Sequence, residues 1–172
     1  MFIIFNGCRK KKEITMINND VLRRIRYVFD YADVKMLAIF AEAGATIDRE
    51  TLSDWLRKEE DPDFSDCSDK NLAYFLNGLI VEKRGKRDGP TPEPESHLTN
   101  NMILMKLKIA FNLQADDMIE ILSMSKMKIS KHELSALFRK PGHKHYRECM
   151  DQLLRNFISG ITKKYRTEKK SE

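Results

Sequence analysis

The sequence NNDVLRRIRYVF at residues 18–29 returns as NNMILMKLKIAF at residues 100–111, and this repetition decides the fold. Extended outward, residues 18–84 align with residues 100–166 at a constant offset of 82 without a gap, and 17 of the 67 paired positions are identical. Many of the other pairs exchange similar side chains. Self-similarity at one fixed period indicates that a single supersecondary unit was duplicated.

Apolar residues in both copies recur at the three- and four-residue spacing of amphipathic helices, without sustained period-two alternation. The four apolar stripes of the first copy lie at residues 21–29, 36–40, 52–56 and 72–80. Those of the second copy lie at residues 103–111, 118–122, 134–138 and 153–161. The sequence therefore predicts an all-α fold of two tandem four-helix repeats, packed with approximate pseudo-twofold symmetry.

The predicted domain boundaries follow from the repeat. We expect helical repeat one at residues 16–84, a proline-rich linker at 85–97, helical repeat two at 98–166 and a charged tail at 167–172. Residues 1–15 have no counterpart in the repeated unit, so we interpret them as a non-native or misannotated extension, with Met16 as the natural start.

Capping patterns mark the starts of several predicted helices. Asn19 and Asn101 are predicted N-caps of the first helix in each repeat, because an asparagine oxygen can accept a bond from an otherwise unpaired helical N–H. Asp48 in repeat one and the capping-box pattern Ser130–Glu133 in repeat two are predicted to open the third helices.

Two of the charged positions that are identical in both copies have opposite signs. Arg57 corresponds to Arg139, and Asp69 corresponds to Asp151. We interpret them as a repeated ion pair between the third and fourth helices, and a functional surface patch is the alternative.

Two small residues are also identical in both copies. Gly78 and Gly160 lie inside the fourth helices, where glycine costs about 1 kcal/mol relative to alanine. Their presence predicts a close approach of two helices, and the boundary between the repeats is the expected place. Cys67 and Cys149 precede the fourth helices and are predicted to be buried packing residues in a reducing compartment.

The net charge of +5 comes from the two ends of the chain. Residues 16–84 carry a charge of −4 and residues 98–162 a charge of +4, so the halves are suited to dock on each other or on a second copy. No apolar stretch approaches the roughly 20 residues that a membrane span requires. We expect a cytoplasmic protein without a membrane partner.

The second and third predicted helices, with Gly44 between them, suggest a helix-turn-helix whose later helix reads nucleic acid. The apolar residues after Gly44 do not have the spacing of a compact turn, and repeat two has Lys126 in its place. Acidic residues of the third helix in repeat one would repel phosphate, so repeat two is the better candidate.

The candidate interaction surface consists of basic residues on the predicted first and third helices and the loop after the third helix. On the first helix they share one face, where an anion could bind, and a merely solvated face is the alternative. The candidate residues are Arg23, Arg26, Arg57, Lys58, Lys131, Arg139, Lys140, Lys144 and Arg147.

Metal binding and catalysis are not expected. His143, His145 and Cys149 are metal-ligand types at short spacing, but a structural zinc site needs four ligands and a fourth is not evident. The sequence contains no glycine-rich phosphate loop and no hydrolase or metalloprotease motif, so we predict neither a cofactor nor an enzymatic activity.

Three stretches of the chain resemble the YehS-like family of small bacterial proteins: MINNDVLRRIRY at residues 16–27, LSDWLRK at 52–58 and LTNN at 98–101. The resemblance covers about residues 16–166 and supports Met16 as the natural start. It implies an all-helical, cytoplasmic bacterial protein with a duplicated domain of unknown function. It implies no assigned activity, no cofactor and no functional residues.

Two hypotheses for the function follow. The first is a non-enzymatic helical module that binds a protein partner or a second copy of itself. The alternative is a nucleic-acid-binding regulator that uses the basic second repeat. Salt dependence distinguishes them, because phosphate binding weakens steeply as ionic strength rises.

Overall fold

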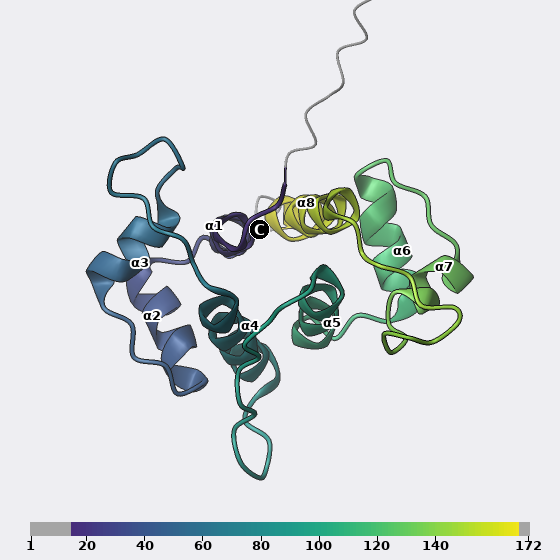
Figure 1. Ribbon diagram of the computed structural model, residues 1–172. Coiled ribbons are helices and arrows are strands. Elements are labelled where there is room, and N and C mark those ends of the chain that lie inside the picture. The colour runs from purple at the N-terminus through teal and green to yellow at the C-terminus, as the bar shows by residue number, and fades with distance from the viewer. Residues whose placement is uncertain (1–14, 169–172) are drawn as a thin grey trace, which may run out of the picture.

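In the computed structural model, which describes residues 15–168, all regular secondary structure is helical (Figure 1). Repeat one contains α1 (Asn18–Phe29), α2 (Asp33–Glu42), α3 (Arg49–Leu56) and α4 (Asp69–Arg84). Repeat two contains α5 (Asn100–Ala110), α6 (Ala115–Met124), α7 (Lys131–Ala136) and α8 (Asp151–Glu168). The predicted all-α fold of two tandem four-helix repeats is confirmed. Residues 1–15 were interpreted as an extension, and all of them except residue 15 lie outside the described range.

The two repeats meet through their first and fourth helices. In Figure 1, α1 lies beside α8 and α4 lies beside α5, with α2 and α3 on one side of this central layer and α6 and α7 on the other. The two contacts between repeats are equivalent, because α1 corresponds to α5 and α4 to α8. Each repeat therefore contributes its first helix to one contact and its fourth helix to the other, which is the predicted pseudo-twofold symmetry.

The apolar stripes of both repeats form one continuous core. At the symmetry centre, the rings of the equivalent residues Phe29 and Phe111 have centroids 5.3 Å apart, and the ring of Tyr165 lies 5.7 Å from each. Aromatic pairs at this separation add to the energy of burial. The largest fully buried side chains include Leu22, Ile25, Met36, Phe40, Leu72, Phe75, Leu104 and Phe157.

The prediction that Asn19 and Asn101 are N-caps is wrong. The N-caps of α1 and α5 are Ile17 and Thr99. Both asparagines lie in the first turn of their helices, and their side chains are buried. A buried amide needs hydrogen-bond partners for its donor and acceptor atoms, and neighbouring loops supply them here.

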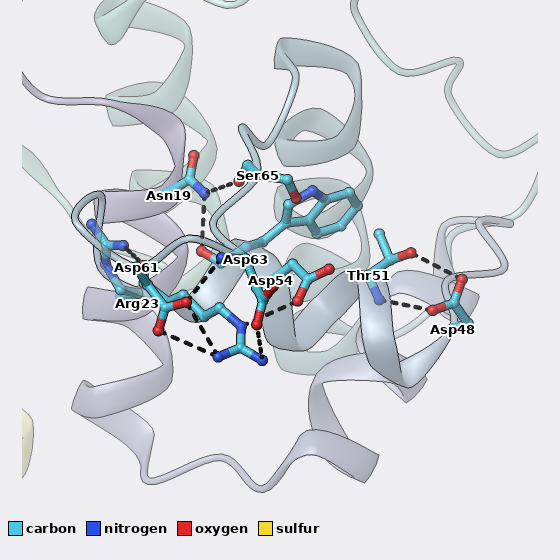
Figure 2. A network of polar contacts seen from close by, with 10 residues as sticks. Asn19, Arg23, Asp48, Thr51, Asp54, Asp61, Asp63 and Ser65 are labelled. Atoms are coloured by element: carbon cyan, nitrogen blue, oxygen red, sulfur yellow. Dashed lines mark hydrogen bonds and ion pairs between the residues drawn. The ribbon is translucent and has the colours of Figure 1, made fainter.

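Asn19 ties α1 to the segment between α3 and α4. Its Nδ2 donates to the carbonyl oxygens of Trp55 and Ser65, both at 2.9 Å (Figure 2). Its Oδ1 accepts from the backbone N–H of Cys67 at 3.0 Å. Asn101 makes the same three contacts in repeat two, with Leu137, Arg147 and Cys149. The two asparagines therefore fix the loop before each fourth helix.

The predicted starts of the third helices are confirmed. Asp48 Oδ1 accepts from the backbone N–H of Thr51 at 2.8 Å (Figure 2), and this bond helps hold the pKa of Asp48 below its ordinary value. Ser130 Oγ accepts from the backbone N–H of Glu133 at 3.2 Å, and Glu133 Oε2 accepts from the N–H of Ser130 at 3.0 Å. These reciprocal bonds form the capping box of α7.

The prediction that Cys67 and Cys149 are buried packing residues is also confirmed. The two residues are free thiols that are 3% and 1% exposed. Burial raises the pKa of both thiols to about 12. Because the thiolate is the reactive form, these cysteines are not nucleophiles near neutral pH.

Asp69 joins the two repeats at the start of α4. Its Oδ1 accepts from Asn18 Nδ2 of repeat one at 2.8 Å, and its Oδ2 accepts from the backbone N–H of Leu98, the first residue of repeat two, at 2.9 Å. Burial raises the pKa of Asp69, but these two bonds and the nearby His97 outweigh it and hold the pKa below its ordinary value.

Asp151 plays the equivalent part at the start of α8. It accepts from Asn100 Nδ2 of its own repeat at 2.7 Å and from the backbone N–H of Met16 in repeat one at 2.9 Å. The predicted ion pair from Asp69 to Arg57 is therefore wrong, because Asn18 and the backbone N–H of Leu98 occupy this carboxylate. Arg57 pairs instead with aspartates near the end of α3.

The close helix approach predicted from Gly78 and Gly160 is confirmed. The expected place, the boundary between the repeats, is wrong. A Cβ atom on Gly78 would lie 1.8 Å from the carbonyl oxygen of Ile39 in α2, and one on Gly160 would lie 2.0 Å from that of Ile121 in α6. Each glycine therefore faces the second helix of its own repeat, and not the boundary between the repeats. It lets α2 and α6 rest directly on the backbones of α4 and α8.

We expect Gly78→Ala and Gly160→Ala each to lower the free energy of unfolding by about 2 kcal/mol or more, because the added methyl group overpacks the contact by more than alanine gains in helix propensity. Urea denaturation followed by circular dichroism measures the change. Lys70→Ala, at an exposed position of α4, is the matched control and should change stability by less than about 0.5 kcal/mol. Equal stability of all three variants would contradict the close approach.

We expect Asp69→Asn to destabilise the protein at neutral pH by about 1–2 kcal/mol, because the new amide group faces N–H donors. Since folding lowers the pKa of Asp69, its ionised form stabilises the fold above the unfolded-state pKa, and this contribution disappears as the pH falls through the folded-state pKa. Denaturation curves of variant and wild type should therefore converge in acid. Asp66→Asn, an exposed neighbour, is the control, and a similar loss in both variants would refute the role of Asp69.

Candidate functional site

The predicted basic residues of repeat one are largely neutralised by carboxylates. Arg23 Nη2 lies 2.8 Å from Asp20 Oδ1, and Arg26 Nη2 lies 2.7 Å from Asp33 Oδ1. Arg23 also donates to the carbonyl oxygen of Arg57. These arginines therefore hold α1 to its neighbours and do not present an unpaired cluster of positive charge.

Arg57 lies within an acidic cluster at the end of α3. Its guanidinium is 3.2 Å from Asp54, 3.3 Å from Asp61 and 3.7 Å from Asp63 (Figure 2). The hydrogen bond to Asp54 and the charges of Asp61 and Asp63 raise the pKa of Arg57 above its ordinary value. This part of repeat one presents more negative than positive charge.

Some of the predicted basic residues of repeat two form ion pairs and others do not. Lys131 pairs with Asp116 at 2.7 Å, and Arg147 pairs with Glu133 at 3.1 Å. The nine predicted residues therefore do not meet in one basic patch. Lys58, Arg139, Lys140 and Lys144 have no ion pair among the described residues, and of these four only Arg139 lines the groove described next.

A groove of about 890 Å³ runs between α4, α5, the end of α7 and the linker at residues 85–97. This volume is in the range of ligand pockets. The long apolar side chains that line it are Ile80, Val81, Met102, Met105, Ile109, Leu137 and Phe138. Among these apolar side chains, those of Met102, Met105 and Ile109 of α5 and of Phe138 after α7 are half-buried. The groove therefore has an apolar wall that a ligand can reach.

Repeat one provides an internal comparison for this wall. Where α5 has Met102 and Met105, the equivalent positions of α1 are Asp20 and Arg23. The duplicated unit folds in the same way with either set, so the fold does not require methionines at these positions. The apolar face of α5 distinguishes repeat two from repeat one.

A polar cluster lies in the same groove. Lys106 Nζ donates to Asn77 Oδ1 at 2.6 Å and pairs with Glu95 Oε1 of the linker at 2.8 Å. The side chain of Lys106 is only 12% exposed. Asn77 Nδ2 and Glu95 Oε2 are buried without a hydrogen-bond partner in the described part of the chain. The cluster is therefore charged, partly buried and incompletely paired.

The groove residues Asn77, Glu95, Met105 and Lys106 were not among the predicted site residues. All nine predicted residues are basic, whereas one wall of the groove is apolar. The informative signal was a different one: equivalent positions of α1 and α5 that differ in polarity on the same helix face.

The residues considered as metal ligands are separated by their surroundings. His143 and His145 lie in an exposed loop, where His143 Nδ1 accepts the backbone N–H of His145 at 3.1 Å, whereas Cys149 is buried. Over residues 15–168, no three or more His, Cys, Asp or Glu side chains gather in a way that suits a metal ion. Within the same range, no helix has the length and apolar character of a membrane span.

Comparisons with known proteins agree with the repeat. The family described as "Protein of unknown function (DUF1456)" matches residues 18–85 and again residues 100–167. The uncharacterized protein YehS of Escherichia coli (strain K12) is 41% identical over 155 residues, which cover 90% of this chain and 99% of YehS. No solved structure matches the chain significantly. The chain belongs to the DUF1456 family and carries two tandem matches to its domain.

Proposed function

We propose that this protein is a non-enzymatic binding module that takes a segment of a partner protein into the groove beside α5. The observation that carries the proposal is the apolar face of Met102, Met105 and Ile109, at positions where repeat one has Asp20, Arg23 and Tyr27. Methionine side chains are flexible and polarizable, so they adapt to different apolar partners. The proposal includes a cytoplasmic location, which the free thiols of the two buried cysteines support, because cysteines stay reduced in that compartment.

The charges around the groove favour a protein segment over nucleic acid. The third helices, which would have to read a duplex, are only 8 and 6 residues long. Lys131 on α7 is already paired with Asp116. Lys140 and Lys144 support the alternative of a nucleic-acid-binding regulator, but two exposed lysines neutralise too few phosphates for tight binding at physiological salt.

The proposal predicts that Met105→Arg, which installs the residue of repeat one, disables binding without disturbing the fold. Peptides selected on the wild-type protein from a phage-displayed random library should bind Met105→Arg about tenfold more weakly, or about 1.4 kcal/mol. The physical reason is that the arginine places a charge on the apolar wall. Fluorescence anisotropy of labelled selected peptides gives the affinities.

Val34→Arg is the matched control for this experiment, because Val34 is an apolar residue of α2 that is 74% exposed and does not line the groove. Thermal unfolding of both variants checks that they remain folded. If every selected peptide binds the two variants equally well, the groove is not the binding site and the proposed function fails.

We also expect Lys140→Ala combined with Lys144→Ala to change nucleic-acid binding by less than about threefold at any salt concentration, because the proposed ligand is a protein segment and the two lysines then make no phosphate contacts to lose. Anisotropy of labelled random-sequence DNA and RNA, at low and near-physiological salt, measures this. Tight binding that falls steeply with salt and is lost in the double variant would establish the regulator alternative instead.

A further inference from the structure

We propose that the linker at residues 85–97, called the strap from here on, lines one side of the groove and places Glu95 where the carboxylate of a ligand binds. The ligand is then a partner peptide with a carboxylate beside apolar residues, and its carboxylate replaces that of Glu95 on Lys106. This inference rests on the proposed function and adds the chemistry of the partner and the internal group that it displaces.

The strap is attached to the groove mainly at one point. Residues 85–93 are exposed, whereas Pro94 and Glu95 are half-buried, and Glu95 pairs with Lys106 at 2.8 Å. Near the other end, Lys86 lies 3.4 Å from Glu42, but the lysine is 76% exposed, and exposed pairs of this kind contribute little. The contact of Glu95 therefore decides whether the strap covers the groove.

The start of the strap is fixed and its middle makes few contacts. Gly85 is the C-cap of α4, and its N–H donates to the carbonyl oxygen of Val81 at 2.8 Å. Residues 86–93 are exposed, and Gly89 has φ = 110°, a conformation that L side chains rarely adopt. The strap can therefore bend at Gly89 while Leu98, bound to Asp69, anchors its end.

The polar cluster is better suited to a free carboxylate than to Glu95. The ammonium group of Lys106 only donates, so Asn77 must turn its oxygen toward Lys106, and Asn77 Nδ2 is then left without an acceptor. Glu95 Oε2 has no donor. One unpaired donor and one unpaired acceptor in the same cluster indicate an imperfect fit. A carboxylate that is not constrained by the strap can accept from both Lys106 and Asn77.

Lys106 also dictates the charge of the ligand. A lysine that is 12% exposed is stable in its charged form only when a partner compensates the lost hydration. A purely apolar ligand that displaced the strap would leave Lys106 unpaired, whereas an acidic one would replace the lost partner. Arg139 on the groove wall, with Lys140 and Lys144 beyond it, adds positive charge that attracts an acidic segment.

The strap provides the probe for the test. A synthetic peptide PTPEPESH, the sequence of residues 90–97, is titrated into the ¹⁵N-labelled full chain, and amide chemical shifts give its dissociation constant. In Glu95→Gln the internal competitor loses its charge, so we expect the peptide to bind at least about tenfold more tightly than to the wild type. Glu93→Gln, an exposed neighbour in the strap, is the matched control and should behave as the wild type does.

Two further arms assign the effect to Lys106. In the first arm, a peptide with glutamine at the position of Glu95 should bind Glu95→Gln no more tightly than it binds the wild type. In the second arm, the original peptide should bind the double variant Glu95→Gln, Lys106→Gln without the gain in affinity that Glu95→Gln alone shows. As a second readout, conformational exchange of the strap amides, measured by ¹⁵N relaxation, should increase in Lys106→Gln alone. That readout keeps the proposal testable if Glu95→Gln does not fold.

The proposal is overturned if Glu95→Gln and wild type bind the peptide equally, if the glutamine peptide binds as well as the original, or if strap exchange is unchanged in Lys106→Gln. These failures are distinguishable from failure of the proposed function. Library peptides that require Met105 but ignore Glu95 would leave the groove as the binding site and remove only the role of the strap.

Discussion

The carboxylates of Asp69 and Asp151 each hold three parts of the molecule together, and the twofold arrangement depends on them. Each lies at the start of a fourth helix, accepts a hydrogen bond from the first asparagine of its own repeat and accepts another from the first backbone N–H of the other repeat. Because the two copies do this reciprocally, α4 is fixed against α5 and α8 against α1. A carboxylate suits this position, since a helix N-terminus favours negative charge and both oxygens accept N–H donors.

The connection between the repeats breaks this symmetry. The fold treats α1 and α5 as equivalent, yet the chain crosses from repeat one to repeat two only through the strap, which lines the groove together with α5. The sequence differs where the surroundings differ: Arg23 of α1 makes an ion pair, whereas the equivalent Met105 of α5 faces the groove. Duplication therefore explains the fold, and divergence after duplication explains the candidate site.

Helical periodicity and the repeat were sufficient to predict the helices, the two units and their symmetric packing, because apolar spacing is a local signal. The roles of the identical polar residues were not predictable in this way. Asn19 binds Cys67, 48 positions away, and Asp69 binds Leu98, 29 positions away, whereas capping and ion-pair patterns consider only near neighbours. The groove escaped prediction because it depends on where the strap lies, which no residue spacing encodes.

A covalently attached cover sets a threshold for any partner of the groove. Because the strap belongs to the same chain, its Glu95 competes for Lys106 at an effective concentration on the order of millimolar. A peptide that only reproduced the carboxylate of Glu95 would rarely displace it. The partner must gain additional free energy elsewhere, and the apolar wall of Met102, Met105 and Ile109 is the surface that offers it. Lys106 then selects the charge of the partner while the methionines determine its affinity. This division requires one apolar and one charged wall in the same groove, the combination that distinguishes α5 from α1.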